Sequence, residues 1–256
     1  MSSCFHENVI NKQLSSCRLL CEAFVVQMAE GLFARRSVAL TGSAVMGALA
    51  ALSTVILPSQ IQPAFPLLPF LRFDPAELFS VLAFLIFGPI PAIVTATVHW
   101  IFLTATSNGE PLGAAAKFAA VLSTLFGLWL GSIAYQRLSI KNNRMSYALG
   151  LMLVSATLTR VLVLLVLNFF IFTYIGPVVF GINYLGFSQT VLQDTLHMQF
   201  AGPSQVLLAM LFFTSIFNAL HALFSVALPY LIVTPLSSKV PQLASEHPWI
   251  SKFSRP

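Results

Sequence analysis

Charged residues are scarce in this chain of 256 residues. Asp, Glu, Lys and Arg together make up 8% of it, whereas hydrophobic residues make up 57%. Ordinary soluble domains contain about 25% charged residues, so this composition excludes a typical water-soluble domain. A hydrophobic stretch of about 20 residues is long enough to cross a bilayer, and the chain has room for several. The composition therefore predicts an all-α, polytopic membrane protein with about six transmembrane helices.

Cysteine and recognisable catalytic motifs are also lacking. The three cysteines, Cys4, Cys17 and Cys21, all precede the first hydrophobic segment. They give neither a disulfide framework nor a complete zinc site. The sequence has no glycine-rich phosphate loop with its lysine, which argues against an ATPase activity of its own. It also has no paired carboxylates and no His/Cys metal cluster. We therefore expect no enzyme, no metal site and no bound cofactor.

Hydrophobic segments and the breaks between them set out the predicted membrane domain. Asp74 is suited to cap a helix with Pro75 at its first position, and Gly88-Pro89-Ile90-Pro91 ends that helix and starts another. The proline-rich stretch at 58–72 cannot be a regular helix, and the long connection at 175–203 is predicted to contain a short interfacial helix. The predicted spans are residues 38–57, 74–87, 89–102, 112–135, 147–174 and 204–234.

The two ends of the chain differ from the membrane domain, which we place at residues 37–235. Residues 1–36 form either an amphipathic helix on the membrane surface or a poorly ordered leader, and residues 236–256 form a polar tail. Most Lys and Arg residues fall on one side of a six-span arrangement. The positive-inside rule then places both termini in the cytoplasm and the loops at 58–72, 104–111 and 175–203 outside, where they would cover one pocket.

Three polar residues within the last two predicted spans mark a candidate binding site. Asn218 and His221 are three residues apart and so share a helix face, and Asn168 lies on the preceding span. Polar groups inside a bilayer are costly unless they have a partner. An Asn amide offers both donors and an acceptor, which suits the imide edge of a flavin or a pyrimidine ring. The alternative is hydrogen bonding between helices with no ligand.

Arg160 and His99 are two further polar residues inside predicted spans. An Arg near the middle of a membrane helix costs several kcal/mol and needs a partner or a wet cavity. In one interpretation, Arg160 lies below the pocket. In the other, its side chain reaches the cytoplasmic membrane surface or contacts a partner protein. A lone His such as His99 is more often a hydrogen-bonded packing residue than a ligand-binding one.

The order of three short motifs resembles the substrate-binding S component of energy-coupling-factor (ECF) vitamin transporters, and most closely its riboflavin type. The motifs are Arg72-Phe73-Asp74, Phe87-Gly88-Pro89 and the polar turn at 104–109. Two further segments, 167–170 and 217–221, resemble the family patterns Leu-Asn-Tyr-Phe and Phe-Asn-x-x-Lys. The resemblance covers residues 38–235, and His221 stands where the family has Lys.

The resemblance implies both a site and a function. In the riboflavin type the positions of Asn168, Asn218 and His221 contact the vitamin. We add to the predicted site Thr106, Asn108, Lys117 and Arg160. Arg160 is expected to compensate for the Lys that is missing at position 221. The function implied is high-affinity riboflavin binding at the plasma membrane, as part of an importer with a transmembrane coupling protein and two ATPase subunits.

Ala44 and Ala48, four residues apart in the first span, match an Ala-x-x-x-Ala element with which the family docks on its coupling protein. Small residues at this spacing allow close approach of another helix, so packing within the bundle is the alternative. For the whole protein the alternatives are an S component or solitary carrier for another vitamin, and a membrane-embedded assembly factor or enzyme in which Arg160 and His99 matter most.

Overall fold

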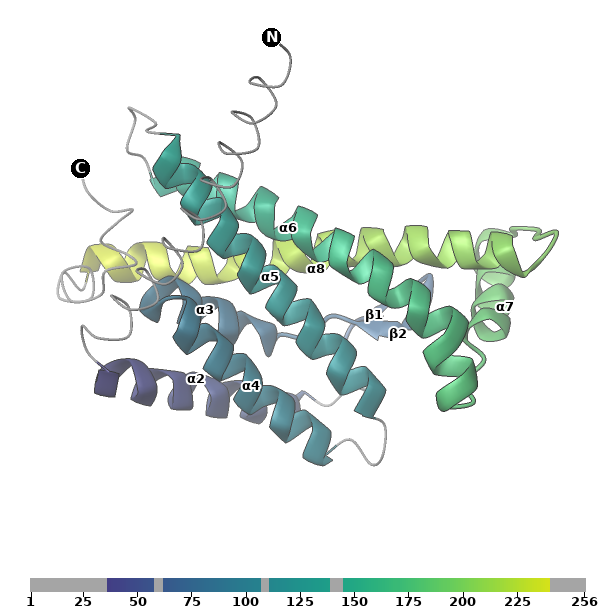
Figure 1. The fold of residues 1–256 in the computed structure, drawn as a ribbon, viewed down its shortest axis with the longest axis horizontal. Coiled ribbons are helices and arrows are strands. Elements are labelled where there is room, and N and C mark those ends of the chain that lie inside the picture. Colours follow the sequence, from purple (N-terminus) through teal and green to yellow (C-terminus); the bar gives the residue numbers. More distant parts are fainter. Residues whose placement is uncertain (1–35, 58–61, 107–110, 139–144, 240–256) are drawn as a thin grey trace, which may run out of the picture.

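The computed structural model describes residues 36–57, 62–106, 111–138 and 145–239, which form a bundle of helices with one small hairpin (Figure 1). Five helical stretches are long and apolar enough to cross a membrane, and a sixth apolar helix, α3, is shorter. This confirms the predicted all-α, polytopic membrane fold. The elements are α2 (Arg36–Ile56), β1 (Ala64–Phe65), β2 (Leu68–Arg72), α3 (Glu77–Phe87), α4 (Pro89–Thr106), α5 (Pro111–Arg137), α6 (Met145–Phe170), η1 (Ile171–Val179), α7 (Tyr184–Leu196) and α8 (Pro203–Lys239).

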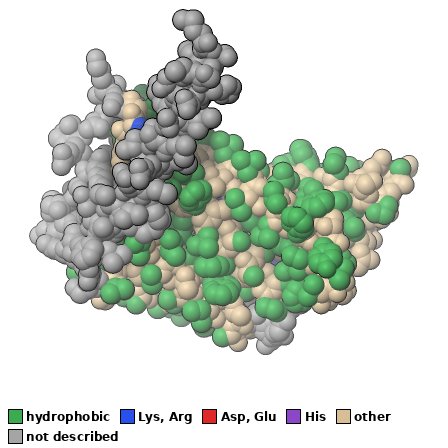
Figure 2. All heavy atoms as spheres, viewed as in Figure 1, with side chains coloured by type: hydrophobic (Ala, Val, Ile, Leu, Met, Phe, Trp, Pro, Cys, Tyr) green, Lys and Arg blue, Asp and Glu red, His purple; other side chains and the backbone are tan. Residues whose placement is uncertain are grey.

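The outside of the bundle is hydrophobic. Green hydrophobic side chains are spread over the face drawn in Figure 2, and very few charged side chains appear on it. Leu208 on α8 is 73% exposed and Leu162 on α6 is 62% exposed. Such side chains are favourable against lipid tails and unfavourable against water, so the surface agrees with the prediction of a multi-pass membrane protein.

The predicted break between α3 and α4 is present, and its chemistry is that of a helix stop. Gly88 has a φ of 99°, a left-handed conformation that glycine tolerates and other residues rarely adopt. Pro89 then begins α4, where its missing N–H costs no helical hydrogen bond. The helix that follows runs to Thr106, one turn beyond the predicted end at 102.

The predicted start of α3 was wrong by two residues. We expected Asp74 to cap the helix, but α3 begins at Glu77 and its N-terminal flanking residue, Ala76, supplies no side-chain cap. Asp74 is buried and accepts a hydrogen bond at Oδ1 from the Ala76 N–H, at 2.9 Å. Its other oxygen, Oδ2, is paired with Lys117 on α5. Both oxygens of Asp74 therefore have other partners, and the side chain does not cap α3.

The proline-rich connection contains a short antiparallel hairpin, in which Phe65 pairs with Leu68 and Ala64 with Arg72. The absence of a regular helix agrees with the prediction, whereas the strand pairing was not predicted. Phe65 and Leu68 are buried, and Phe65 packs against Phe217 of α8 with ring centroids 5.6 Å apart. In Figure 1 the hairpin continues the line of α3 between α5 and α8.

The last part of the bundle is longer than predicted. The predicted span at 147–174 is α6, which passes into the π-helix η1, and α8 is 37 residues long, from Pro203 to Lys239. The helix predicted within 175–203 is present as α7, and its place at the membrane interface stays a prediction. Asn183 caps it, because its Oδ1 accepts a hydrogen bond from the Gly186 N–H at 2.9 Å.

Helices α5 and α6 approach each other closely along two glycines of α5. A Cβ placed on Gly131 would lie 2.5 Å from the Cα of Met152, and one placed on Gly127 would lie 2.5 Å from the Cα of Ala156. The two backbones are thus in direct contact, as small residues allow in membrane helices. This contact places Arg160, one turn after Ala156, beside α5.

Several predictions fall on residues that the structure does not describe. The leader at 1–36 lies almost entirely in the range 1–35, most of the tail lies in the range 240–256, and Asn108 lies in the range 107–110. The division into leader, membrane domain and tail therefore stays a prediction.

Candidate functional site

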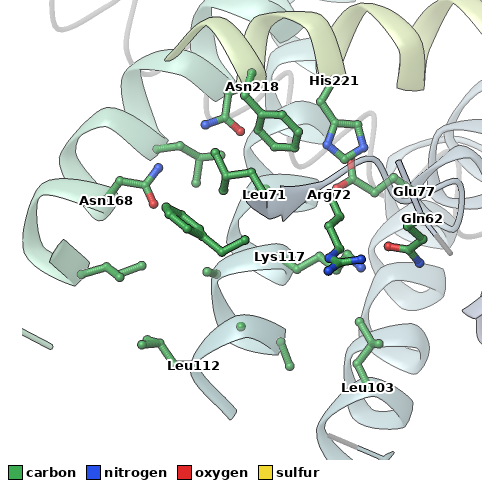
Figure 3. A pocket seen from close by; sticks show the side chains of 18 of the residues that line it. Gln62, Leu71, Arg72, Glu77, Leu103, Leu112, Lys117, Asn168, Asn218 and His221 are labelled. Atoms are coloured by element: carbon green, nitrogen blue, oxygen red, sulfur yellow. The ribbon is translucent and has the colours of Figure 1, made fainter. Parts of the chain in front are cut away.

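A cavity of about 910 Å³ opens beside the hairpin, enclosed by residues from α2 to α8. It has the size of a typical small-molecule site, and its wall is mostly apolar with a few polar groups. Figure 3 shows Asn168 and Asn218 on one side of this space and Glu77, Gln62 and Arg72 on the other. The polar residues that line it are Thr54, Gln62, Arg72, Glu77, Thr106, Lys117, Arg160, Asn168, Asn218 and His221.

Arg160 of α6 is held by an ion pair in the interior of the bundle. Its Nη1 lies 2.6 Å from Oε2 of Glu77, and its Nη2 lies 3.2 Å from Oε1 of the same carboxylate. Both residues are almost completely buried, with Arg160 1% and Glu77 2% exposed. This two-point geometry is the strongest form of Arg–carboxylate pairing. Arg160 therefore does not reach the membrane surface, and that interpretation of the sequence was wrong.

The remaining donors of Arg160 are also used. Nη1 donates to Oγ1 of Thr124 at 3.1 Å, Nε lies 3.4 Å from Oδ1 of Asn218, and Nη2 lies 3.2 Å from Nδ1 of His221. The guanidinium thus links α3, α5, α6 and α8 at one point. A buried charge is tolerated only when its hydrogen bonds are satisfied in this way.

A second ion pair joins the start of α3 to α5. Lys117 pairs with Oδ2 of Asp74, whose side chain is only 1% exposed, whereas that of Lys117 is 24% exposed. Lys117 also lines the cavity. The two ion pairs place an opposite charge beside each of these four charged groups.

His221 is fixed between aromatic rings. The centroid of its ring lies 5.5 Å from that of Phe73 and 5.3 Å from that of Phe217, both in edge-on contact. The ring is 2% exposed, and the backbone of Asp74 lies within hydrogen-bonding reach of it. The nearest carboxylate oxygen, Oε2 of Glu77, is 3.7 Å from Nε2, which is too far for a hydrogen bond.

The two asparagines differ in how much of their hydrogen-bonding capacity remains. Asn218 is buried; its Oδ1 faces Arg160, and its Nδ2 donates to the Thr214 carbonyl at 2.9 Å. Asn168 is half-buried on α6, lines the cavity, and makes no side-chain hydrogen bond to any residue described. Asn168 is therefore the amide with both donors and its acceptor still available.

The cavity brings together most of the predicted site residues, because Asn168, Asn218, His221, Thr106, Lys117 and Arg160 all line it. Thr106 is exposed at the end of α4, where its hydroxyl donates to the Phe102 carbonyl at 2.9 Å. Asn108 lies outside the described residues. Whether these residues bind a ligand stays a prediction.

Ala44 and Ala48 lie away from the cavity, on α2. Both are exposed, whereas Ser43, Gly47 and Ala50 on the same helix are buried. The face of α2 that packs into the bundle is thus a different one from the face that carries the two alanines. Their exposure fits an external docking role better than packing within the bundle.

Glu77 is the residue that sequence reasoning missed. It is the carboxylate that holds Arg160, and it also accepts a hydrogen bond from Ser225 of α8 at 3.3 Å. A signal was present in the sequence: an Arg inside a bilayer requires a counter-charge, and Glu77 lies next to an apolar helix. Glu77 was missed because only neighbours close in the sequence were considered. Asp74 was assigned to helix capping for the same reason.

His99 has the packing role that we predicted. It is 3% exposed on α4, and its Nε2 lies 3.0 Å from Oγ1 of Thr54 on α2. The hydrogen bond joins the two helices within the membrane domain. Across the described ranges, no three His, Cys, Asp or Glu side chains are grouped so as to hold a metal ion.

One solved structure is similar to this chain. It is described as the S component of a bacterial ECF transporter, and the match has a TM-score of 0.56 and 23% sequence identity. The match covers 80% of this chain and 99% of that chain. At this identity the likeness shows the fold, and it confirms the predicted S-component-like helical bundle. No family model and no curated protein matches the sequence.

Proposed function

We propose that this chain is the substrate-binding membrane subunit, or S component, of an ECF-type importer, and that it takes up riboflavin across the plasma membrane. The observation that carries the proposal is the cavity of about 910 Å³, lined by Asn168, Asn218 and His221, within a fold similar to that of a bacterial S component. The polar groups sit in an otherwise apolar wall, as expected for a site that binds a flat, mostly apolar ring.

The chemistry of riboflavin suits this wall. The pyrimidine edge of its ring system alternates carbonyl acceptors with one N–H donor, and the free amide of Asn168 can match such an alternation. The molecule has no net charge, which agrees with the pairing of Glu77 with Arg160 and of Asp74 with Lys117. Its hydroxylated tail would then lie toward the end of α4, near Thr106.

The proposed role includes partners. An S component does no covalent chemistry, and import would need a transmembrane coupling protein and two ATPase subunits. The exposed pair of Ala44 and Ala48 on α2 is the docking surface that we propose for the coupling protein. In the proposed orientation both termini are cytoplasmic, and the hairpin lies on the outer side.

The first test is whether the protein carries a flavin. We expect the detergent-purified protein to show a flavin absorbance band, and denaturation to release about one flavin per chain. A colourless protein that also fails to quench the fluorescence of added riboflavin would remove riboflavin as the substrate. A thermal-shift screen of other vitamins would then separate an S component for another vitamin from a protein that binds none.

Asn168→Ala is expected to weaken riboflavin binding by about tenfold to a hundredfold, because a buried polar edge of the ligand loses its partner, at a cost of about 1–3 kcal/mol. The dissociation constant is read from fluorescence quenching. Asn168 is chosen over Asn218 because Asn218 also contacts Arg160, so its loss would disturb the ion pair. Gln193→Ala, which truncates an exposed amide on α7 away from the cavity, is the matched control. Equal affinities for the two variants would contradict the assignment of Asn168.

A further inference from the structure

Gln62, just before the hairpin, has an amide whose orientation is fixed. Its Nε2 donates a hydrogen bond to the carbonyl oxygen of Leu57, just after α2, at 2.9 Å. The amide nitrogen therefore faces the end of α2, and the amide oxygen, Oε1, faces away from it. Figure 3 shows this oxygen on the side of Gln62 that is turned toward Arg72 and Lys117. Among the residues that the structure describes, Oε1 has no hydrogen-bond partner.

This acceptor belongs to the wall of the cavity. Gln62 is only 7% exposed, and it is one of the residues that line the cavity. A buried carbonyl oxygen without a donor is unfavourable, and a hydroxyl or N–H group of a ligand would satisfy it. Because Leu57 holds the nitrogen of the amide, Gln62 presents an acceptor to the ligand rather than a donor.

A ligand has room to reach Gln62 from the side of Asn168. The two amides lie on opposite sides of the cavity, with Lys117 of α5 between them in the view of Figure 3. Next to Lys117, α5 lines the cavity with side chains no larger than a methyl group, at Gly113, Ala114, Ala116 and Ala120. A Cβ placed on Gly113 would meet no atom within 4 Å. The cavity is therefore open along α5.

We propose that Gln62 is a specificity-determining residue, whose Oε1 accepts a hydrogen bond from a hydroxyl group in the tail of the ligand while Asn168 contacts the ring. This rests on the proposed function and adds to it a requirement for a hydroxylated tail. A ligand with the same ring but no hydroxyl group loses this bond. Gln62 lies outside the predicted spans, so a search for polar residues within apolar helices does not find it.

Riboflavin and lumiflavin, which has a methyl group in place of the hydroxylated tail, test this role. Their dissociation constants are measured by fluorescence quenching for the wild-type protein and for Gln62→Met, which has an apolar side chain of similar length. We expect Gln62→Met to weaken riboflavin binding about tenfold and to leave lumiflavin binding within about twofold. Gln193→Met, on α7 away from the cavity, is the matched control and is expected to change neither constant. An equal loss for both ligands would overturn the proposal.

A second measurement uses the wild-type protein, so it does not depend on how well the variant folds. In protein labelled with ¹³C at the side-chain carbonyl of glutamine, the Gln62 signal is assigned by its absence from Gln62→Met. A carbonyl carbon signal moves downfield when its oxygen accepts a hydrogen bond. We expect riboflavin to move the Gln62 signal downfield and lumiflavin to leave it in place. A signal that moves with both ligands, or with neither, would contradict the assignment.

The outcomes separate this inference from the proposed function. If riboflavin does not bind the wild-type protein, the proposed substrate fails, and the role of Gln62 fails with it. If riboflavin binds equally well to the wild-type protein and to Gln62→Met, the role of Gln62 alone is overturned, and riboflavin binding stands.

Discussion

Glu77→Gln is expected to lower the free energy of unfolding by about 3–5 kcal/mol, the cost of leaving one member of a buried ion pair without its partner. Arg160 is 1% exposed and cannot turn to water, and both nitrogens that contact the carboxylate would lose a charged acceptor. For a chain of this size each kcal/mol corresponds to roughly 2–4 °C in the melting temperature. Thermal unfolding in detergent, followed by circular dichroism, measures the change.

Two further variants make this result specific to the ion pair. Glu77→Gln/Arg160→Gln removes both charges and is expected to recover a large part of the stability that Glu77→Gln loses, because buried ion pairs contribute little net stability. Asp194→Asn, at an exposed acid on α7, is expected to leave the melting temperature nearly unchanged. A double variant that is less stable than the single one would contradict the assigned pairing.

Gly131→Ala is expected to destabilise the bundle, although alanine normally stabilises a helix relative to glycine. The added Cβ would lie 2.5 Å from the Cα of Met152, so α5 and α6 would have to move apart along their whole contact. Such overpacking lowers the free energy of unfolding by about 1–3 kcal/mol. The helical preference for alanine over glycine offsets only about 0.5–1 kcal/mol of this loss. Gly127→Ala, which meets Ala156 in the same way, is expected to behave alike.

The matched control for Gly131→Ala is on the facing helix. Gly150 of α6 is exposed and has open space around its Cα, so Gly150→Ala is expected to raise the melting temperature slightly. The two substitutions are chemically identical and have opposite expected signs. A gain in stability for both would show that α5 and α6 do not pack as closely as described.

Local signals in the sequence were sufficient for much of the fold. The Gly88–Pro89 break was predictable because a glycine and a proline act on the backbone next to them. The hydrophobic spans followed from composition, since a membrane admits few other patterns. The hairpin at 64–72 was not predictable in this way. Proline excluded a helix there, but strand pairing depends on the burial of Phe65 and Leu68 against α8, which is a tertiary contact.

The candidate site was predicted in part, because local signals mark some of its residues and the pairing of others depends on tertiary contacts. Asn168, Asn218 and His221 stand out because each is polar within an apolar span, and they line one cavity. Glu77 and Arg160 are 83 positions apart in the chain, so their pairing depends on how the helices are arranged. The sequence indicates that Arg160 needs a partner, and only the arrangement of α3 against α6 shows which carboxylate provides it.

The length of α3 has a consequence for the interior of the protein. At 11 residues it is about 17 Å long, roughly 10 Å shorter than the 18-residue α4 beside it. The hairpin continues the line of α3 where further turns of helix could otherwise stand, and the cavity opens beside it (Figure 1). The protein therefore obtains its internal space by omitting part of one helix, so the longer helices can remain a closed wall against lipid. A change in the residue at which α3 begins would then alter the space beside the hairpin and leave the side chains that face the membrane in place.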